Sequence, residues 1–138
     1  MIKSIYFYLF VAAFGFGMWA CTHKEDKFKN LTSKQFEELI KDPSIQLVDV
    51  RTVAEYTEGH IPGSLNINVK DEEGFPLAID ELLDKGKPVA VYCRSGRRSR
   101  TAAELLIKKG FQKVYNLDKG ILNWMEEGRE INKPTERF

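Results

Sequence analysis

Reactive and positively charged side chains are concentrated in one segment of the chain, residues 93–100, which reads Cys-Arg-Ser-Gly-Arg-Arg-Ser-Arg. An apolar stretch at 88–92 precedes it and a helix-like stretch at 101–107 follows, which predicts a strand, a tight loop and a helix. Ligands of open α/β sheets bind at the carboxyl ends of the strands, and a helix amino terminus attracts anions. Gly96 permits the curled backbone that makes neighbouring N–H groups converge. We therefore expect Cys93 to be a thiolate nucleophile.

The opposing interpretation is that Cys93 is a small buried hydrophobic residue with no chemical role. A structural cysteine does not need a glycine turn and four arginines beside it, and this loop has Arg94, Arg97, Arg98 and Arg100. The composition of the loop therefore favours the reactive interpretation.

A second dense cluster contains Asp49, Arg51, Glu55 and His60. His60 is a possible general base for Cys93, but its neighbours Gly59 and Pro62 favour a turn in which the ring binds backbone. The other three are a possible acid–base set. Their spacing across a strand end and a helix start better suits an ion-pair network that positions the loop.

The amino-terminal residues differ from the rest of the chain. Lys3 is the only charge in residues 1–20, and the uncharged run at 5–20 is shorter than the roughly 20 residues that a membrane-spanning helix needs. These features are typical of an export signal. Cys21 follows the small residue Ala20, so this part of the sequence resembles the site at which a lipoprotein signal peptidase cleaves its substrates. Lipidated Cys21 is the favoured interpretation over an uncleaved anchor or simple secretion, and all three export the domain to the cell envelope. With lipid on Cys21, the chain would face the periplasm.

Charge and composition exclude several other classes. Without residues 1–20 there are 20 basic residues (21 minus Lys3) against 20 acidic ones, which argues against a nucleic-acid partner. No Cys/His spacing matches a zinc site and no nucleotide-type glycine loop is present, so we expect neither a metal nor a cofactor.

Strand-like and helix-like segments alternate along the rest of the chain, which predicts one parallel α/β domain with about five strands and helices on both faces. The expected strands are 45–50, 65–69, 89–92 and 113–117, and the expected helices begin near Thr32 and cover 53–58, 77–83, 101–109 and 121–127. Residues 1–20 are expected to be the signal, 21–30 a linker, 31–130 the domain and 131–138 a tail.

Three ordered motifs make the chain resemble a known family. Asp49-Val50-Arg51 with Gly59-His60-Ile61-Pro62-Gly63-Ser64 is similar to the first rhodanese signature. Val91-Tyr92-Cys93-Arg94-Ser95-Gly96-Arg97-Arg98-Ser99 is similar to the active loop of single-domain rhodaneses. Val114-Tyr115-Asn116-Leu117 with Gly120 and Trp124 resembles the closing signature, although Lys119 stands where a glycine is usual.

The resemblance implies that Cys93 accepts a sulfane sulfur as a persulfide, which a thiol or cyanide acceptor then removes. The small sulfur-containing anion would be held mainly by N–H groups of the loop residues Arg94, Ser95, Gly96, Arg97, Arg98 and Ser99, with Asp49, Arg51, Glu55 and His60 as supports. Ser95 occupies a position where two-domain rhodaneses often have a cation, so the natural donor is left open. A monomer is expected.

Two other functions compete with sulfur transfer. Cysteine phosphatases have Arg six positions after the cysteine, and here Ser99 is at that position, while Arg98 is five positions on. The shorter loop suits a sulfur atom better than a phosphate. A non-catalytic carrier of persulfide or polysulfide, serving an envelope partner, would need the same stable persulfide and remains the alternative.

Overall fold

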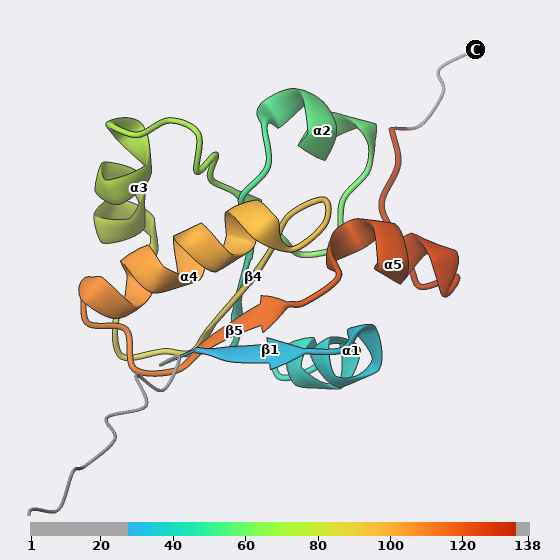
Figure 1. Cartoon of the computed structure of the whole chain (residues 1–138), viewed down its shortest axis with the longest axis horizontal. Coiled ribbons are helices and arrows are strands. Elements are labelled where there is room, and N and C mark those ends of the chain that lie inside the picture. The colour runs from blue at the N-terminus through green and yellow to red at the C-terminus, as the bar shows by residue number, and fades with distance from the viewer. Residues whose placement is uncertain (1–27, 135–138) are drawn as a thin grey trace, which may run out of the picture.

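A single sheet organises the protein, and the computed structural model describes residues 28–134 of it (Figure 1). The strands are β1 (Lys29–Leu31), β2 (Gln46–Asp49), β3 (Leu65–Asn66), β4 (Val89–Tyr92) and β5 (Val114–Leu117). The helices are α1 (Ser33–Ile40), α2 (Val53–Glu58), α3 (Gly74–Leu82), α4 (Arg97–Lys108) and α5 (Gly120–Glu126). All pairings are parallel, in the order β1-β5-β4-β2-β3.

Side chains of β4 alternate between two apolar clusters, one on each face of the sheet. Val91 packs with α3 and α4 residues such as Phe75 and Leu106. Ala90 and Tyr92 pack on the other face with α1 and α5, where Phe36 meets Trp124 edge to face at 6.3 Å between ring centroids. Helices therefore cover both faces, as the sequence predicts, and the strand that precedes Cys93 is buried throughout.

The first two helices, α1 and α2, begin where the sequence predicts. Thr32 and Thr52 each form a capping box. The threonine hydroxyl accepts a hydrogen bond from the backbone N–H three residues later, and the side chain of that later residue accepts one from the threonine N–H. The box at Thr52 involves Glu55 and begins α2, which matches the predicted 53–58. This short helix buries none of its side chains, so its position depends on polar contacts rather than packing.

The structure corrects several predicted boundaries. Lys29 and Asn30, assigned to the linker, form an edge strand beside β5, and the preceding Phe28 is buried in the core. At the other end, residues 131–132 are not a free tail, because Asn132 pairs with His60 in an antiparallel bridge. The strand expected over 65–69 spans two residues, and α4 begins at 97 rather than 101.

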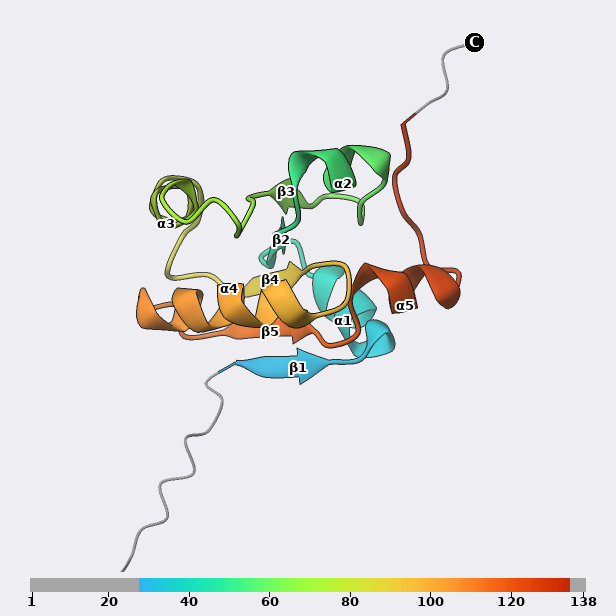
Figure 2. The same ribbon diagram turned by 45° about the horizontal axis from the view of Figure 1, so that its top comes forward.

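Figure 2, turned by 45° from the view of Figure 1, shows β1 at one border of the sheet and β3 at the other. No helix within residues 28–134 is long and apolar enough to cross a membrane. The predicted signal at 1–20 and the predicted lipidation site Cys21 lie outside the described residues.

Candidate active site

Cys93 directly follows β4, and its sulfur accepts hydrogen bonds from the turn and the first helical turn after it. The backbone N–H of Gly96 donates to Sγ at 3.1 Å and the hydroxyl of Ser99 at 3.3 Å. Gly96 has a φ of 97°, a left-handed conformation that disfavours other residues, and it caps α4. The turn thus places the buried thiol against the amino-terminal turn of a 12-residue helix, where N–H groups have no intrahelical partner.

The loop is held from behind by the start of α5. The carbonyl of Cys93 accepts from Ile121 N–H at 2.9 Å, and the carbonyl of Arg94 accepts from Leu122 N–H at 3.2 Å. Gly120 has a φ of +67°, and a Cβ there would collide with the backbone of Arg94. Lys119, the departure from the usual motif, has a φ of −100° and needs no glycine.

A Cβ on Gly96 would likewise collide with the carbonyl of Asp118. The active loop and the β5–α5 connection are therefore in backbone contact at two glycines. This close packing fixes the shape of the loop before any ligand arrives.

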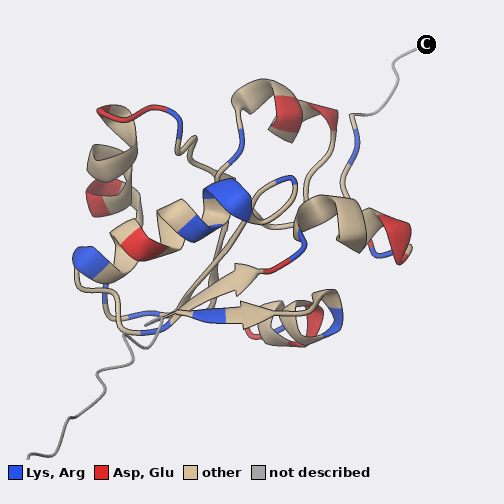
Figure 3. Ribbon diagram, viewed as in Figure 1, with Lys and Arg blue, Asp and Glu red and all other residues tan. Residues whose placement is uncertain are grey.

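Only part of the arginine charge faces outward. Arg98 is clamped by Glu55 through two hydrogen bonds of 2.7 and 2.9 Å, and Arg100 lies 3.6 Å from Asp118. Arg94 and Arg97 are exposed and make none of the ion pairs found in residues 28–134. Figure 3 shows this charge gathered in the loop and the first turn of α4, near acidic residues of α2. We conclude that Arg98 joins α4 to α2 by binding Glu55, whereas the side chains of Arg94 and Arg97 are free to attract an anion.

The hydrogen bond from Arg98 is the main reason that the pKa of Glu55 falls to about 2, with a further contribution from Thr52. Glu55 therefore stays ionised at neutral pH and holds α2 against α4. This contact agrees with the positioning role that the sequence favoured.

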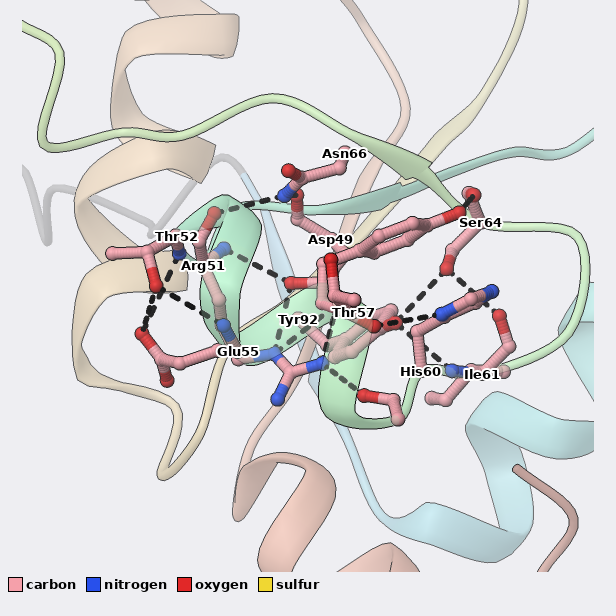
Figure 4. Close-up of polar contacts among 12 residues, drawn as sticks. Asp49, Arg51, Thr52, Glu55, Thr57, His60, Ile61, Ser64, Asn66 and Tyr92 are labelled. Atoms are coloured by element: carbon pink, nitrogen blue, oxygen red, sulfur yellow. Dashed lines mark hydrogen bonds and ion pairs between the residues drawn. The ribbon is translucent and has the colours of Figure 1, made fainter. Parts of the chain in front are cut away.

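Asp49 and Arg51 form a buried ion pair at the carboxyl end of β2 (Figure 4). Arg51 Nη2 lies 2.6 Å from Asp49 Oδ2 and also donates to the Gly59 carbonyl at 2.7 Å, while Nε binds the same carboxylate. Asn66 donates to the carbonyls of Asp49 and Arg51, which ties β3 to this corner. These bonds brace the backbone under α2 and resemble scaffold, as predicted, more than an acid–base pair.

His60 is not placed as a base for Cys93. Its ring stacks on Tyr56 at 3.8 Å between centroids, and Nδ1 lies 2.9 Å from the Tyr56 carbonyl. No hydrogen bond between His60 and Cys93 occurs among the described residues, and the sulfur's partners are Gly96 and Ser99. The turn interpretation is the one that the geometry supports.

Ser99 differs from the expectation of direct substrate binding. Its side chain is completely buried, and its hydroxyl points at the Cys93 sulfur and the Gly96 carbonyl. Ser99 thus lies beneath the Cys93 sulfur, whereas Ser95 is exposed at the turn. Among the described residues, no three His, Cys, Asp or Glu side chains are arranged to hold a metal.

A groove that adjoins the loop was not predicted from the sequence. It has a volume of about 300 Å³ and is lined by Arg51 and Arg94 together with α5 and the segment after it. Leu122, Met125 and Lys133 belong to this lining. Nothing in their local sequence marks them, because they are brought together only when α5 packs beside the loop.

The fold and the site define the class of the protein: it is a parallel α/β domain in which β4, in the middle of the sheet, ends beside a cysteine that faces the amino terminus of a helix. A model of the rhodanese-like domain matches residues 32–127, so the chain belongs to the rhodanese-like domain family. It is 35% identical over 99 residues to the thiosulfate sulfurtransferase GlpE of Shewanella oneidensis, covering 72% of this chain and 94% of that protein.

Two further similarities are informative. A tRNA uridine(34) hydroxylase of Picosynechococcus is 40% identical over 96 residues, but the chain spans about a third (32%) of that protein's length. The polysulfide-sulfur transferase homodimer of Wolinella succinogenes has a TM-score of 0.65 at 29% identity, covering 80% of this chain and 82% of that one. Sulfur-transferring proteins are therefore among the relatives that match over most of their own length.

Proposed function

We propose that this protein is a sulfurtransferase in which Cys93 carries the sulfur as a persulfide. The Cys93 thiolate attacks the outer sulfur of a donor such as thiosulfate, the donor S–S bond breaks, and sulfite leaves with the bonding electron pair. An acceptor such as cyanide or a thiolate then attacks the sulfane sulfur, and the Cys93 thiolate leaves. Each half-reaction balances without any further oxidant or reductant.

The observation that carries this proposal is the pair of donors on the Cys93 sulfur. Gly96 N–H and the Ser99 hydroxyl point at Sγ, and a negative charge on sulfur strengthens such bonds. The exposed Arg94 and Arg97 add attraction for an anionic donor. A preorganised cradle of this kind stabilises both the thiolate that attacks and the persulfide that forms.

The experiment is a transfer assay with thiosulfate and cyanide, combined with intact-mass analysis of the protein. We expect thiosulfate to add one sulfur mass to the wild type, cyanide to remove it, and Cys93→Ser to abolish both. Multiple turnover distinguishes an enzyme from a carrier. A mass gain in the Cys93→Ser variant would contradict the assignment of the nucleophile.

The second candidate is a non-catalytic carrier of persulfide or polysulfide that hands sulfur to an envelope partner. The similarity to a polysulfide-sulfur transferase favours keeping it. Stable loading of Cys93 without turnover towards cyanide or thiols would support the carrier over the enzyme.

We also propose that the domain is exported and held at a membrane through lipid on Cys21. All strands are parallel, so the chain enters β1 at the amino-terminal edge of the sheet, while Cys93 follows the carboxyl end of β4. A tether ending at Phe28 would therefore present the active loop on the side of the sheet opposite the anchor. Labelling with a palmitate analogue tests this: the wild type should be labelled and Cys21→Ala should not, whereas equal labelling would refute lipidation of Cys21.

A further inference from the structure

The groove beside the active loop is larger than the proposed sulfur donor requires. Its volume of about 300 Å³ lies at the lower end of pockets that hold small organic ligands, roughly 300–1,000 Å³. Thiosulfate and the diatomic cyanide ion fill only a fraction of such a space. The groove is therefore sized for a molecule with a carbon skeleton.

The groove adjoins the active loop through Arg94 and the start of α5. Ile121 and Leu122 line it, and their N–H groups bind the carbonyls of Cys93 and Arg94. Arg94 itself forms part of the wall. A molecule lying in the groove is thus next to the loop that holds the sulfur, which is the position that a second substrate needs.

One end of the groove contains a buried arginine with unused hydrogen-bonding capacity. Arg51 is only 6% exposed, and its Nε and Nη2 are bound to Asp49 and Gly59. Its Nη1 makes none of the hydrogen bonds found in residues 28–134, and Figure 4 shows that nitrogen without a dashed line. Because Arg51 lines the groove, an anion there would complete its donor set.

The remaining walls divide by polarity. The exposed cations Arg94 and Lys133 lie in the same lining as Arg51, whereas Leu122, Met125 and Ile131 form an apolar side. Glu55 also lines the groove, but Arg98 already neutralises it. Glu58 is the acidic lining residue without an ion pair among the described residues, and its charge offsets one of the two exposed cations. The groove therefore has a small positive excess, which suits a ligand with one carboxylate better than a ligand with two.

We propose that this groove binds the sulfur acceptor, and that the acceptor is a small thiol carrying a carboxylate. The inference rests on the sulfur-transfer function proposed above. The carboxylate binds Arg51 and Lys133 while the carbon chain lies along the apolar side. The thiol gives its proton to solvent, its sulfur attacks the sulfane sulfur of the persulfide, and the Cys93 thiolate leaves as the acceptor persulfide forms.

The test compares two acceptors that differ in charge, 3-mercaptopropionate and neutral 3-mercapto-1-propanol, with the full chain in detergent and thiosulfate as donor. The readout is the ratio of kcat/KM for the charged thiol to that for the neutral thiol. Because this ratio is compared between proteins, the intrinsic reactivity of the thiols cancels. The test variant is Lys133→Glu, and Lys70→Glu, an exposed residue outside the groove, is the matched control.

We expect Lys133→Glu to lower the ratio about fivefold, mainly through KM of the charged thiol, and Lys70→Glu to leave it near the wild-type value. Equal ratios in the two variants would overturn the acceptor site, as would a persulfide-loaded protein that transfers to neither thiol. Failure of the proposed function looks different: Cys93 then gains no sulfur from thiosulfate, whichever acceptor is present.

Discussion

Glu55 on α2 holds Arg98, the second residue of α4, through two hydrogen bonds, so a helix with no buried side chain is locked onto the helix that follows the active loop. The same contact explains why the sequence overestimated the charge open to substrate. The guanidinium of Arg98 forms an ion pair with the Glu55 carboxylate, so Arg94 and Arg97 are the loop cations that remain exposed to an incoming anion.

This ion pair should be lost in acid. The pKa of Glu55 lies near 2, below the ordinary 4.5, so the pair stabilises the fold fully above about pH 4.5 and loses its effect as the pH falls towards 2. We expect Glu55→Gln to lower the thermal midpoint at pH 7 and to approach the wild type at pH 3. Glu104→Gln, exposed on α4, is the control and should show no comparable convergence. A constant gap between Glu55→Gln and wild type would contradict this.

Comparing alanine substitutions at Gly120 and Gly128 distinguishes the cost of backbone strain from the cost of a steric collision. Their φ values are +67° and +71°, but a Cβ meets the Arg94 backbone only at Gly120 and finds open space at Gly128. We expect Gly128→Ala to cost about 1 kcal/mol of unfolding free energy, and Gly120→Ala about 2 kcal/mol more with loss of sulfur transfer. Urea unfolding measures both, and equal costs would show that the loop relaxes around the methyl group.

The Asp49–Arg51 pair should matter far more than an exposed pair. Both side chains are buried, and Asp49→Asn leaves the arginine charge without its counterion, which we expect to cost about 3 kcal/mol. The control is Glu38→Gln, which breaks a pair whose side chains are both 65% exposed and should not shift the unfolding midpoint measurably. Similar midpoints for the two variants would be incompatible with a bracing role.

Ser99→Ala removes a hydroxyl donor from the sulfur while Gly96 N–H remains. The Gly96 carbonyl keeps its bond from Arg100 N–H, so the change orphans no buried acceptor there. We expect alkylation of Cys93 by iodoacetamide at neutral pH to slow about three- to tenfold with little change in stability. Thr101→Ala, exposed on α4, serves as control, and unchanged alkylation in Ser99→Ala would remove Ser99 from the site.

Local sequence was sufficient for most of the elements. The starts of α1, after Thr32, and of α2, at Val53, lie where the sequence predicted them, and the apolar run before Cys93 predicted β4. The active-loop helix was placed four residues late, because Arg97 to Arg100 are polar and show no apolar periodicity. β1 was missed because three residues at an edge carry too little pattern to distinguish them from a linker.

By itself, the sequence determined the fold class, the candidate nucleophile Cys93 and the tight turn that holds it, since these depend on residues close together in the chain. Only the tertiary structure decided which charges are used and which are free. Glu55 and Arg98 are 43 residues apart, and the groove joins α2, the active loop and the segment after α5. Such contacts depend on how the helices pack around the carboxyl ends of the strands, and the spacing of residues along the chain does not predict that packing.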